Sequence, residues 1–117
     1  MSINKSTRRQ LIGLARRKNA RITTWSREIP TDWRPRSVRN PHGDFDTHFS
    51  DQSAWELIAS ELEACREVEI ISLDKPPGAK GYVMLIELEP DASPVYVKVQ
   101  LRGNKIIGRS FHYSEVK

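Results

Sequence analysis

The chain is poor in cysteine and in long apolar runs. Cys65 is the single cysteine among 117 residues, which excludes an internal disulfide and fits a reducing compartment. Its neighbours on a predicted helix are apolar, so we expect Cys65 in the core. No apolar run approaches the ~20 residues of a membrane span, and the N-terminus lacks the apolar stretch of a signal peptide. These absences favour a cytoplasmic protein without a membrane partner.

Motifs for cofactors and covalent catalysis are also missing. The sequence has no glycine loop that cradles phosphates, and no Cys or Ser with a recognisable base nearby. His42, Asp44, Asp46 and His48 fall within seven residues, but their spacing matches neither a zinc nor a calcium site. Pro, Gly and Asp are ordinary in turns. We expect no metal and no small-molecule cofactor.

Acidic residues are scarce at the start of the chain. Residues 1–39 hold eleven Lys and Arg residues but only Glu28 and Asp32, whereas the remainder has an acidic excess. A basic arm over residues 1–40 indicates nucleic acid or an acidic protein as a partner. Alternatively, the arm folds back onto the acidic helix of its own chain.

The length of the chain predicts one domain, residues 1–117, with a single core. Ser6 or Thr7 is expected to cap a first helix that runs to about residue 19. Pro30, Pro35 and Pro41 interrupt residues 20–49, and we expect Trp25 and Trp33 to pack over the core. The alternative is that this segment offers stacking and phosphate contacts. Ser50 is expected to cap a second helix that runs to about residue 66.

Strand patterns fill the rest of the chain. Residues 68–73 and the nearly continuous apolar run 81–88 predict two strands, and residues 94–113 predict a hairpin with Gly103 and Asn104 in its turn. The expected fold is α+β: an N-terminal helix, a second helix and a four-stranded antiparallel meander, with the helices on one face and the core over residues 50–113.

A two-residue turn fixes the expected hairpin register. Arg102 then faces Lys105, Lys98 faces Arg109, and Tyr96 faces Phe111. Opposed residues share a face of the sheet. The expected core face carries Val95, Val97, Val99, Leu101, Ile106, Gly108 and Ser110. The expected outer face carries Tyr96, Lys98, Gln100, Arg102, Lys105, Ile107, Arg109, Phe111 and Tyr113.

This outer face combines four cations and three aromatic rings without an acid. Like charges placed directly opposite one another cost about 0.2–1 kcal/mol per pair, and a bound anion removes that cost. Aromatic rings can stack on bases. The face therefore predicts RNA or phosphate binding, unless acidic residues elsewhere neutralise it or it is simply solvated.

Three segments resemble a known family. Residues 50–55, SDQSAW, are similar to a Ser-Asp-His-Thr-x-Trp segment that opens a helix. Residues 95–99, VYVKV, are similar to a Val-Tyr-Leu-Lys strand, and residues 106–112 to a final strand ending Ser-Phe-Lys. Together they resemble the MqsR-type branch of the RelE-like mRNA-interferase toxins.

The resemblance implies a RelE-like fold, metal-independent cleavage of RNA and an antitoxin-like protein partner. Tyr96 would occupy the position of the toxin's functional tyrosine, and His112 that of its terminal catalytic lysine. The expected register places His112 on the core face, so either a bulge rotates the strand end or this histidine is structural.

RNA cleavage of this kind needs a base for the 2′-hydroxyl proton, an acid for the leaving oxygen and cations for the charge that develops. Tyr96, Phe111 or Tyr113 could stack on an RNA base. Lys98 and Arg109 suit the phosphate, His112 suits the proton, and without His112 a tyrosine, Tyr96 or Tyr113, would need a lowered pKa. Further RNA contacts are expected from Gln100, Arg102, Lys105, Phe111, Arg8, Arg9, Arg16 and Arg17. The alternatives are a non-catalytic nucleic-acid-binding module and a protein-interaction domain that use the same face.

Overall fold

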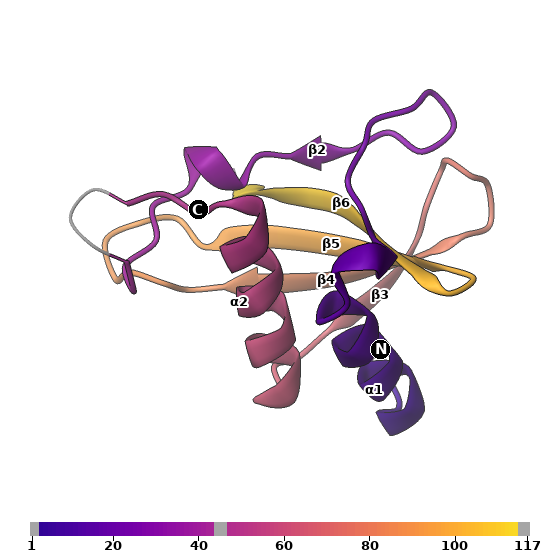
Figure 1. Cartoon of the computed structure of the whole chain (residues 1–117), viewed down its shortest axis with the longest axis horizontal. Coiled ribbons are helices and arrows are strands. Elements are labelled where there is room, and N and C mark those ends of the chain that lie inside the picture. Colours follow the sequence, from indigo (N-terminus) through magenta and orange to yellow (C-terminus); the bar gives the residue numbers. More distant parts are fainter. Residues whose placement is uncertain (1–2, 44–46, 115–117) are drawn as a thin grey trace.

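The computed structural model describes residues 3–43 and 47–114 (Figure 1). Its two α-helices are α1 (Lys5–Ala15) and α2 (Asp51–Glu63), and two short 3₁₀ turns are η1 (Lys18–Ala20) and η2 (Pro35–Ser37). The strands are β1 (Arg21–Ile22), β2 (Asp32–Trp33), β3 (Glu69–Ser72), β4 (Lys80–Ile86), β5 (Val95–Arg102) and β6 (Lys105–Tyr113).

The two helices begin at different kinds of cap. Ser50 caps α2 as predicted, because its side chain accepts from the Ser53 backbone N–H while the Ser53 side chain accepts from the Ser50 N–H. The first helix is present as predicted, but its predicted cap and its predicted end were wrong. Asn4, in extended conformation, accepts from the Thr7 N–H at 2.7 Å, so α1 begins earlier than expected, and it ends at Ala15.

The chain leaves α2 through a residue in the left-handed region. Cys65 has a φ of 61° and is exposed, so the expectation that it lies in the core was wrong. The helix had ended at Glu63, and the reversal at its C-terminus turns this side chain outward.

The sheet contains the predicted antiparallel meander and two strands that were not predicted. Its order is β1-β6-β5-β4-β3, with β3, β4, β5 and β6 paired antiparallel. Both β1 and β2 pair with β6 in parallel, Arg21 beside Ile106 and Asp32 beside Ser110. Two-residue strands carry no periodic pattern, so only their pairing with β6 defines them.

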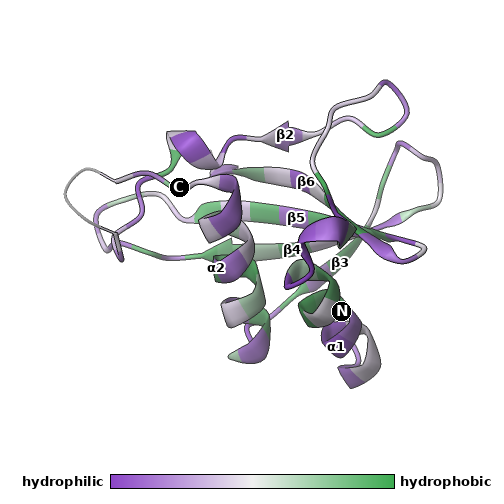
Figure 2. Cartoon of the chain, in the orientation of Figure 1, coloured by the Kyte–Doolittle hydropathy of each residue, from purple (hydrophilic) through white to green (hydrophobic). Residues whose placement is uncertain are grey.

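The helices cover one face of the sheet, which confirms the α+β fold. α1 and α2 lie side by side across the strands (Figure 1), and hydrophobic segments line the layer between helices and sheet (Figure 2). Leu11, Trp55, Met84, Val97 and Ile106 are buried there in one cluster. Among the described residues, no helix is long and apolar enough to cross a membrane.

The two tryptophans of the proline-rich segment have different environments. Trp33 stacks on Trp55 with ring centroids 4.9 Å apart, as the packing prediction requires. Trp25 is 62% exposed, so the same prediction was wrong for it. It lies in the loop between β1 and β2, which the bond from the Thr31 hydroxyl to the Thr23 carbonyl closes at 3.0 Å.

Candidate functional site

A β-bulge in the hairpin changes which residues share a face. The pairs Arg102–Lys105 and Leu101–Ile106 are as predicted, but the register shifts between Lys98 and Val99. Beyond the shift Lys98 pairs with Ser110 and Tyr96 with His112. The predicted pairs of Lys98 with Arg109 and Tyr96 with Phe111 were wrong, because β6 has one extra residue at this point.

The bulge moves two aromatic side chains onto the helix-covered face. Phe111 is completely buried, with its ring centroid 5.4 Å from those of both Trp33 and Phe49. Tyr113 packs against the core, and its hydroxyl accepts from the Arg39 N–H at 3.0 Å. Their expected position on the outer face was wrong, and Phe111 has no exposed ring on which a base could stack.

The same shift places His112 beside Tyr96 on the other face, which we call the open face. Their rings stack with centroids 5.6 Å apart and an interplanar angle of 18°. The Lys98 Nζ atom lies 6.0 Å from the Tyr96 ring centroid. The bulge therefore brings a tyrosine, a lysine and a histidine together, three of the side chains predicted for catalysis.

An acid that the sequence analysis missed completes this cluster. The Asp32 Oδ2 atom lies 3.3 Å from His112 Nε2, since β2 pairs with β6 and sets Asp32 beside Ser110. Arg34 contacts both carboxylate oxygens of Asp32, at 2.7 and 3.0 Å. No local pattern could have indicated Asp32, because its neighbour in the site is 80 residues further along the chain. We call Asp32, Tyr96, Lys98 and His112 the open-face cluster.

The hydrogen bonds of His112 distinguish its two ring nitrogens. Nδ1 lies 2.9 Å from the Tyr113 backbone oxygen. A carbonyl oxygen can only accept, so Nδ1 carries a proton. Nε2 then faces the Asp32 carboxylate, which would stabilise a charged ring.

Burial and neighbouring charges shift the pKa values of two cluster members. Partial burial raises the pKa of Tyr96, and the negative charge of Glu69 adds to the effect. The alternative in which Tyr96 acts through a lowered pKa is therefore wrong for this arrangement, and its phenol keeps its proton. Burial lowers the pKa of Lys98, with a further contribution from Arg109, although Asp32 and Asp74 oppose both.

Two predicted site residues are buried next to this cluster. Arg109 is 5% exposed and Gln100 is 3% exposed. The Arg109 Nη1 atom donates to the Gln100 Oε1 atom and to the Lys75 carbonyl, both at 2.7 Å, and its buried Nε has no hydrogen-bond partner. Arg109 thus anchors the β3–β4 loop on the sheet, and burial lowers its pKa. Neither side chain is placed to meet a phosphate in this arrangement.

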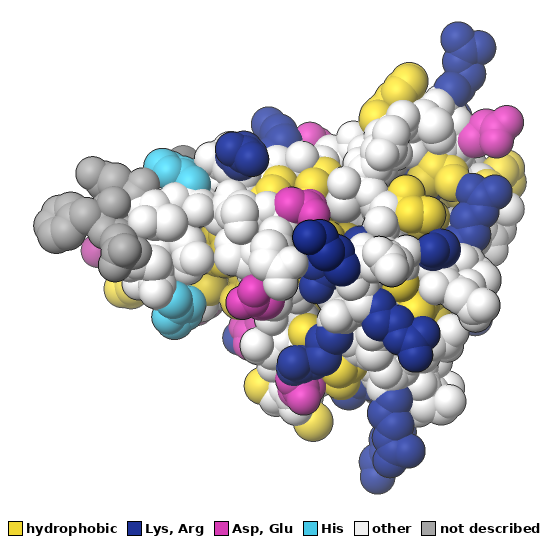
Figure 3. Space-filling view, viewed as in Figure 1, with side chains coloured by type: hydrophobic (Ala, Val, Ile, Leu, Met, Phe, Trp, Pro, Cys, Tyr) yellow, Lys and Arg dark blue, Asp and Glu magenta, His cyan; other side chains and the backbone are white. Residues whose placement is uncertain are grey.

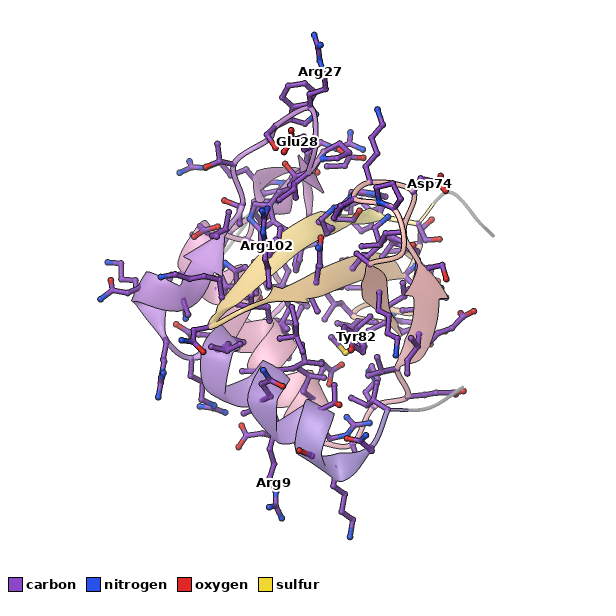
Figure 4. The ribbon with its side chains drawn as sticks, turned by 90° about the vertical axis from the view of Figure 1, so that its right-hand side faces the viewer. Arg9, Arg27, Glu28, Asp74, Tyr82 and Arg102 are labelled. Carbon is purple, nitrogen blue, oxygen red and sulfur yellow. The ribbon has the colours of Figure 1, made fainter. Side chains whose placement is uncertain are left out.

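The remaining predicted cations lie away from the cluster. Arg102 and Lys105 flank the exposed hairpin turn, where the Lys105 Nζ donates to the Asn19 carbonyl at 2.6 Å. Figure 4 looks at this end of the molecule and shows Arg102 on the hairpin and Arg9 pointing away from α1. The structure thus separates them from Tyr96 and His112, at the far ends of the two strands.

Part of the basic arm folds back on the second helix. Arg8 donates to the carbonyls of Leu62 and Arg66 at 2.9 and 3.0 Å, and Arg16 pairs with Glu63. Arg9 and Arg17 remain exposed. Figure 3 shows dark-blue cations over α1 and the neighbouring loops, with acidic side chains nearer α2. Two of the four arginines that were predicted to contact RNA, Arg8 and Arg16, therefore help to join the first helical segment to α2.

The residues considered for a metal site do not gather in the described parts of the chain. No group of three His, Cys, Asp or Glu side chains there could hold an ion. Asp44 and Asp46 lie outside the described residues. The open-face cluster itself holds an imidazole beside a carboxylate, a lysine and a phenol, groups that can move a proton and stabilise charge.

Comparison with known proteins leaves the cluster as the main guide to function. No protein-family model, no curated protein and no solved structure matches this chain. The likeness to RelE-like toxins therefore depends on the three short sequence segments alone.

Proposed function

We propose that the protein binds RNA on its open face and cleaves it without a metal ion, as an endoribonuclease of the toxin type. The observation that carries the proposal is the open-face cluster. One face holds a histidine 3.3 Å from a carboxylate, stacked on a tyrosine, with a lysine alongside. Such a set supplies a proton carrier, a partner for its charged form and a cation for a phosphate.

His112 takes the proton in the proposed mechanism. Its Nε2 accepts the proton of a ribose 2′-hydroxyl as that oxygen attacks the adjacent phosphorus, and Asp32 stabilises the imidazolium that forms. The phosphorus–oxygen bond to the 5′-oxygen then breaks, which leaves a 2′,3′-cyclic phosphate. The 5′-oxygen takes a proton from water, and His112 later returns its own proton to water. The 2′-hydroxyl must displace Asp32 from Nε2. The Asp32 side chain can move away from Nε2 because it is 51% exposed, and its ion pair with Arg34 can persist when it moves.

Lys98 and Tyr96 stabilise the phosphate in this scheme. The ammonium of Lys98 offsets the charge that develops on the phosphoryl oxygens. Tyr96 remains a phenol, since its pKa is raised, and can therefore donate a hydrogen bond to the same group. Arg109 acts indirectly, because it holds the β3–β4 loop in place beside Lys98.

The test is cleavage of a mixed-sequence RNA by the purified protein with EDTA present. We expect the wild type to cleave and to leave 2′,3′-cyclic phosphate ends. His112→Ala should slow cleavage by about 10²-fold or more, as for loss of a general base, and Lys98→Ala should slow it by a similar factor. Lys80→Ala is the matched control, because Lys80 is exposed on β4 and lies outside the cluster.

Two results would contradict the proposal. One is no cleavage by the wild type, and the other is cleavage that His112→Ala and Lys98→Ala leave unchanged. Because Lys98 and His112 are partly exposed, their substitution by Ala is not expected to unfold the protein. Circular dichroism of each variant checks that point.

A second candidate is a module that binds RNA or an antitoxin-like acidic protein without cleaving anything. The observation that favours it is that both ring nitrogens of His112 already have partners in the free protein. It predicts salt-sensitive binding that Lys98→Ala weakens, without turnover. Either activity on RNA would be exerted in the cytoplasm.

A further inference from the structure

A hollow of about 350 Å³ adjoins the open-face cluster on the side of Tyr96. Its size lies at the lower end of the range for small-ligand sites, ~300–1,000 Å³. The residues that line it are Arg66, Glu67, Glu69, Val83, Leu85 and Tyr96.

The strand register explains the shape of this hollow. Leu85 pairs with Tyr96 on one side of β4, and Val83 pairs with Glu69 on the other. Strands β3 and β5 lie two interstrand spacings apart, roughly 9.5 Å. The side chains of Val83 and Leu85 therefore form a floor, with Glu69 on one edge and Tyr96 on the other.

The floor exposes apolar surface where a ligand could cover it. Leu85 is 49% exposed, and Trp25 is the other large hydrophobic side chain that is exposed in the described residues. Leu85, Tyr96 and His112 follow one another across three adjacent strands. A flat group on Leu85 would thus lie one strand from Tyr96 and two strands from the histidine.

The charges around the hollow exclude a phosphate and favour hydrogen-bond donors. Glu67 and Glu69 offer carboxylates, which only accept hydrogen bonds. The cation at this end, Arg66, is already engaged with the Glu61 carboxylate at 2.9 Å and the Leu85 carbonyl at 3.2 Å. The negative charge of Glu69 acts on Tyr96 at the opposite edge of the hollow, because it contributes to the raised pKa of that phenol.

We propose that this hollow is a nucleobase subsite, in which the base lies on the exposed side chain of Leu85 and donates hydrogen bonds to the Glu69 carboxylate. The inference rests on the proposed function. The phosphate attached to this nucleotide would be at Lys98, which pairs with Val83 on the neighbouring strand.

The subsite discriminates between bases by the donors on their Watson–Crick edges. Guanine presents two adjacent donors, N1–H and the 2-amino group, to one carboxylate. Adenine and cytosine each present an amino group next to an acceptor nitrogen. Uracil presents one N–H between two carbonyl oxygens, which a carboxylate repels. The expected order of affinity is guanine first and uracil last.

The experiment measures binding of 2′-O-methyl RNA hexamers, which cannot be cleaved through the 2′-oxygen. One internal base is varied among guanine, inosine, adenine, cytosine and uracil, and the other five are uracil. For the wild type we expect guanine to bind about tenfold or more tightly than uracil, as for one bidentate contact. Inosine lacks the 2-amino group, so the hexamer that contains it should bind with an affinity between those of the guanine and uracil hexamers.

Glu69→Gln should remove most of the preference for guanine over uracil. Its affinity for the all-uracil hexamer should stay within about twofold of the wild-type value. Glu87→Gln is the matched control, because Glu87 follows β4 and does not line the hollow. An unchanged preference in Glu69→Gln, or equal affinities in the wild type, would overturn the subsite. If the subsite were overturned in this way but the wild type still cleaved RNA, the proposed endoribonuclease function would stand without the nucleobase subsite. A wild type that neither bound nor cleaved would overturn both.

Discussion

Gly108 lies directly under the indole ring of Trp33. A Cβ atom added at this glycine would come within 2.5 Å of Trp33 Cζ3 and within 2.6 Å of Cε3. This approach lets β2 pair with β6, and the pairing in turn sets Asp32 beside His112. The close approach of Trp33 to Gly108 thus supports the position of the carboxylate in the open-face cluster.

Gly108→Ala is therefore expected to destabilise the protein by roughly 1–3 kcal/mol, the usual range for overpacking a core. The control is Gly13→Ala in α1, where a new Cβ meets nothing within 4 Å. That change should stabilise the protein by about 0.5–1 kcal/mol, because alanine favours the helix. Urea unfolding of both variants measures the two effects. Equal shifts would contradict the close approach of Trp33 to Gly108.

The lowered pKa of Lys98 predicts how stability depends on pH. In the folded state Lys98 loses its proton at a lower pH than in the unfolded state, where its pKa is near the ordinary 10.5. At a pH between the folded-state pKa and the unfolded-state pKa of Lys98, the unfolded protein therefore binds more protons than the folded protein. The contribution of Lys98 to the free energy of unfolding accordingly increases as pH rises from the lower pKa to the higher one. Below both pKa values the side chain is charged in the folded and unfolded states, and the full cost of burying that charge then opposes folding.

Lys98→Met is accordingly expected to be more stable than the wild type at pH 7, with the difference shrinking as pH approaches 10.5. The measurement is the free energy of unfolding in urea at several pH values. Lys80→Met should show no such trend, because Lys80 is exposed. A difference that grew with pH would contradict the direction of the shift.

Trp25 is expected to dominate the quenchable tryptophan fluorescence. Its side chain is 62% exposed, whereas Trp55 is fully buried and Trp33 is partly buried between Trp55 and Phe111. Trp25→Phe should therefore remove most of the emission that acrylamide quenches. Quenching that stayed the same in this variant would show that the β1–β2 loop folds over the ring. Figure 4 places Arg27 and Glu28 at the outer end of this loop.

The capping box of α2 supports a further prediction. Ser50→Ala removes the acceptor for the Ser53 N–H and should lower the free energy of unfolding by about 1 kcal/mol. Ser60→Ala, at an exposed position within α2, should cost nothing because alanine is the better helix former. Thermal unfolding separates the two variants, and a Ser50→Ala variant as stable as Ser60→Ala would contradict the role of this cap.

Local patterns predicted much of the fold. The alternation of Val95, Val97 and Val99 predicted β5, Gly103 and Asn104 predicted the turn, and Ser50 predicted the start of α2. Each signal depends on residues close together in the chain, whose preferences act before any tertiary contact forms. The order of elements and the α+β class follow from these signals.

The candidate site depended on contacts that no local pattern contains. Tyr96 and Lys98 share one face of β5 in any fold that keeps this strand, because side chains alternate along a strand. His112 joins them and Phe111 does not, because the bulge in the folded sheet shifts β6 by one residue. The folded sheet also sets the place of Asp32, through a two-residue parallel pairing across 78 positions of the chain, with Trp33 packed on Gly108. A one-residue shift in the β5–β6 register moves every later side chain of β6 to the opposite face of the sheet. Packing of the whole sheet edge selects the shifted register.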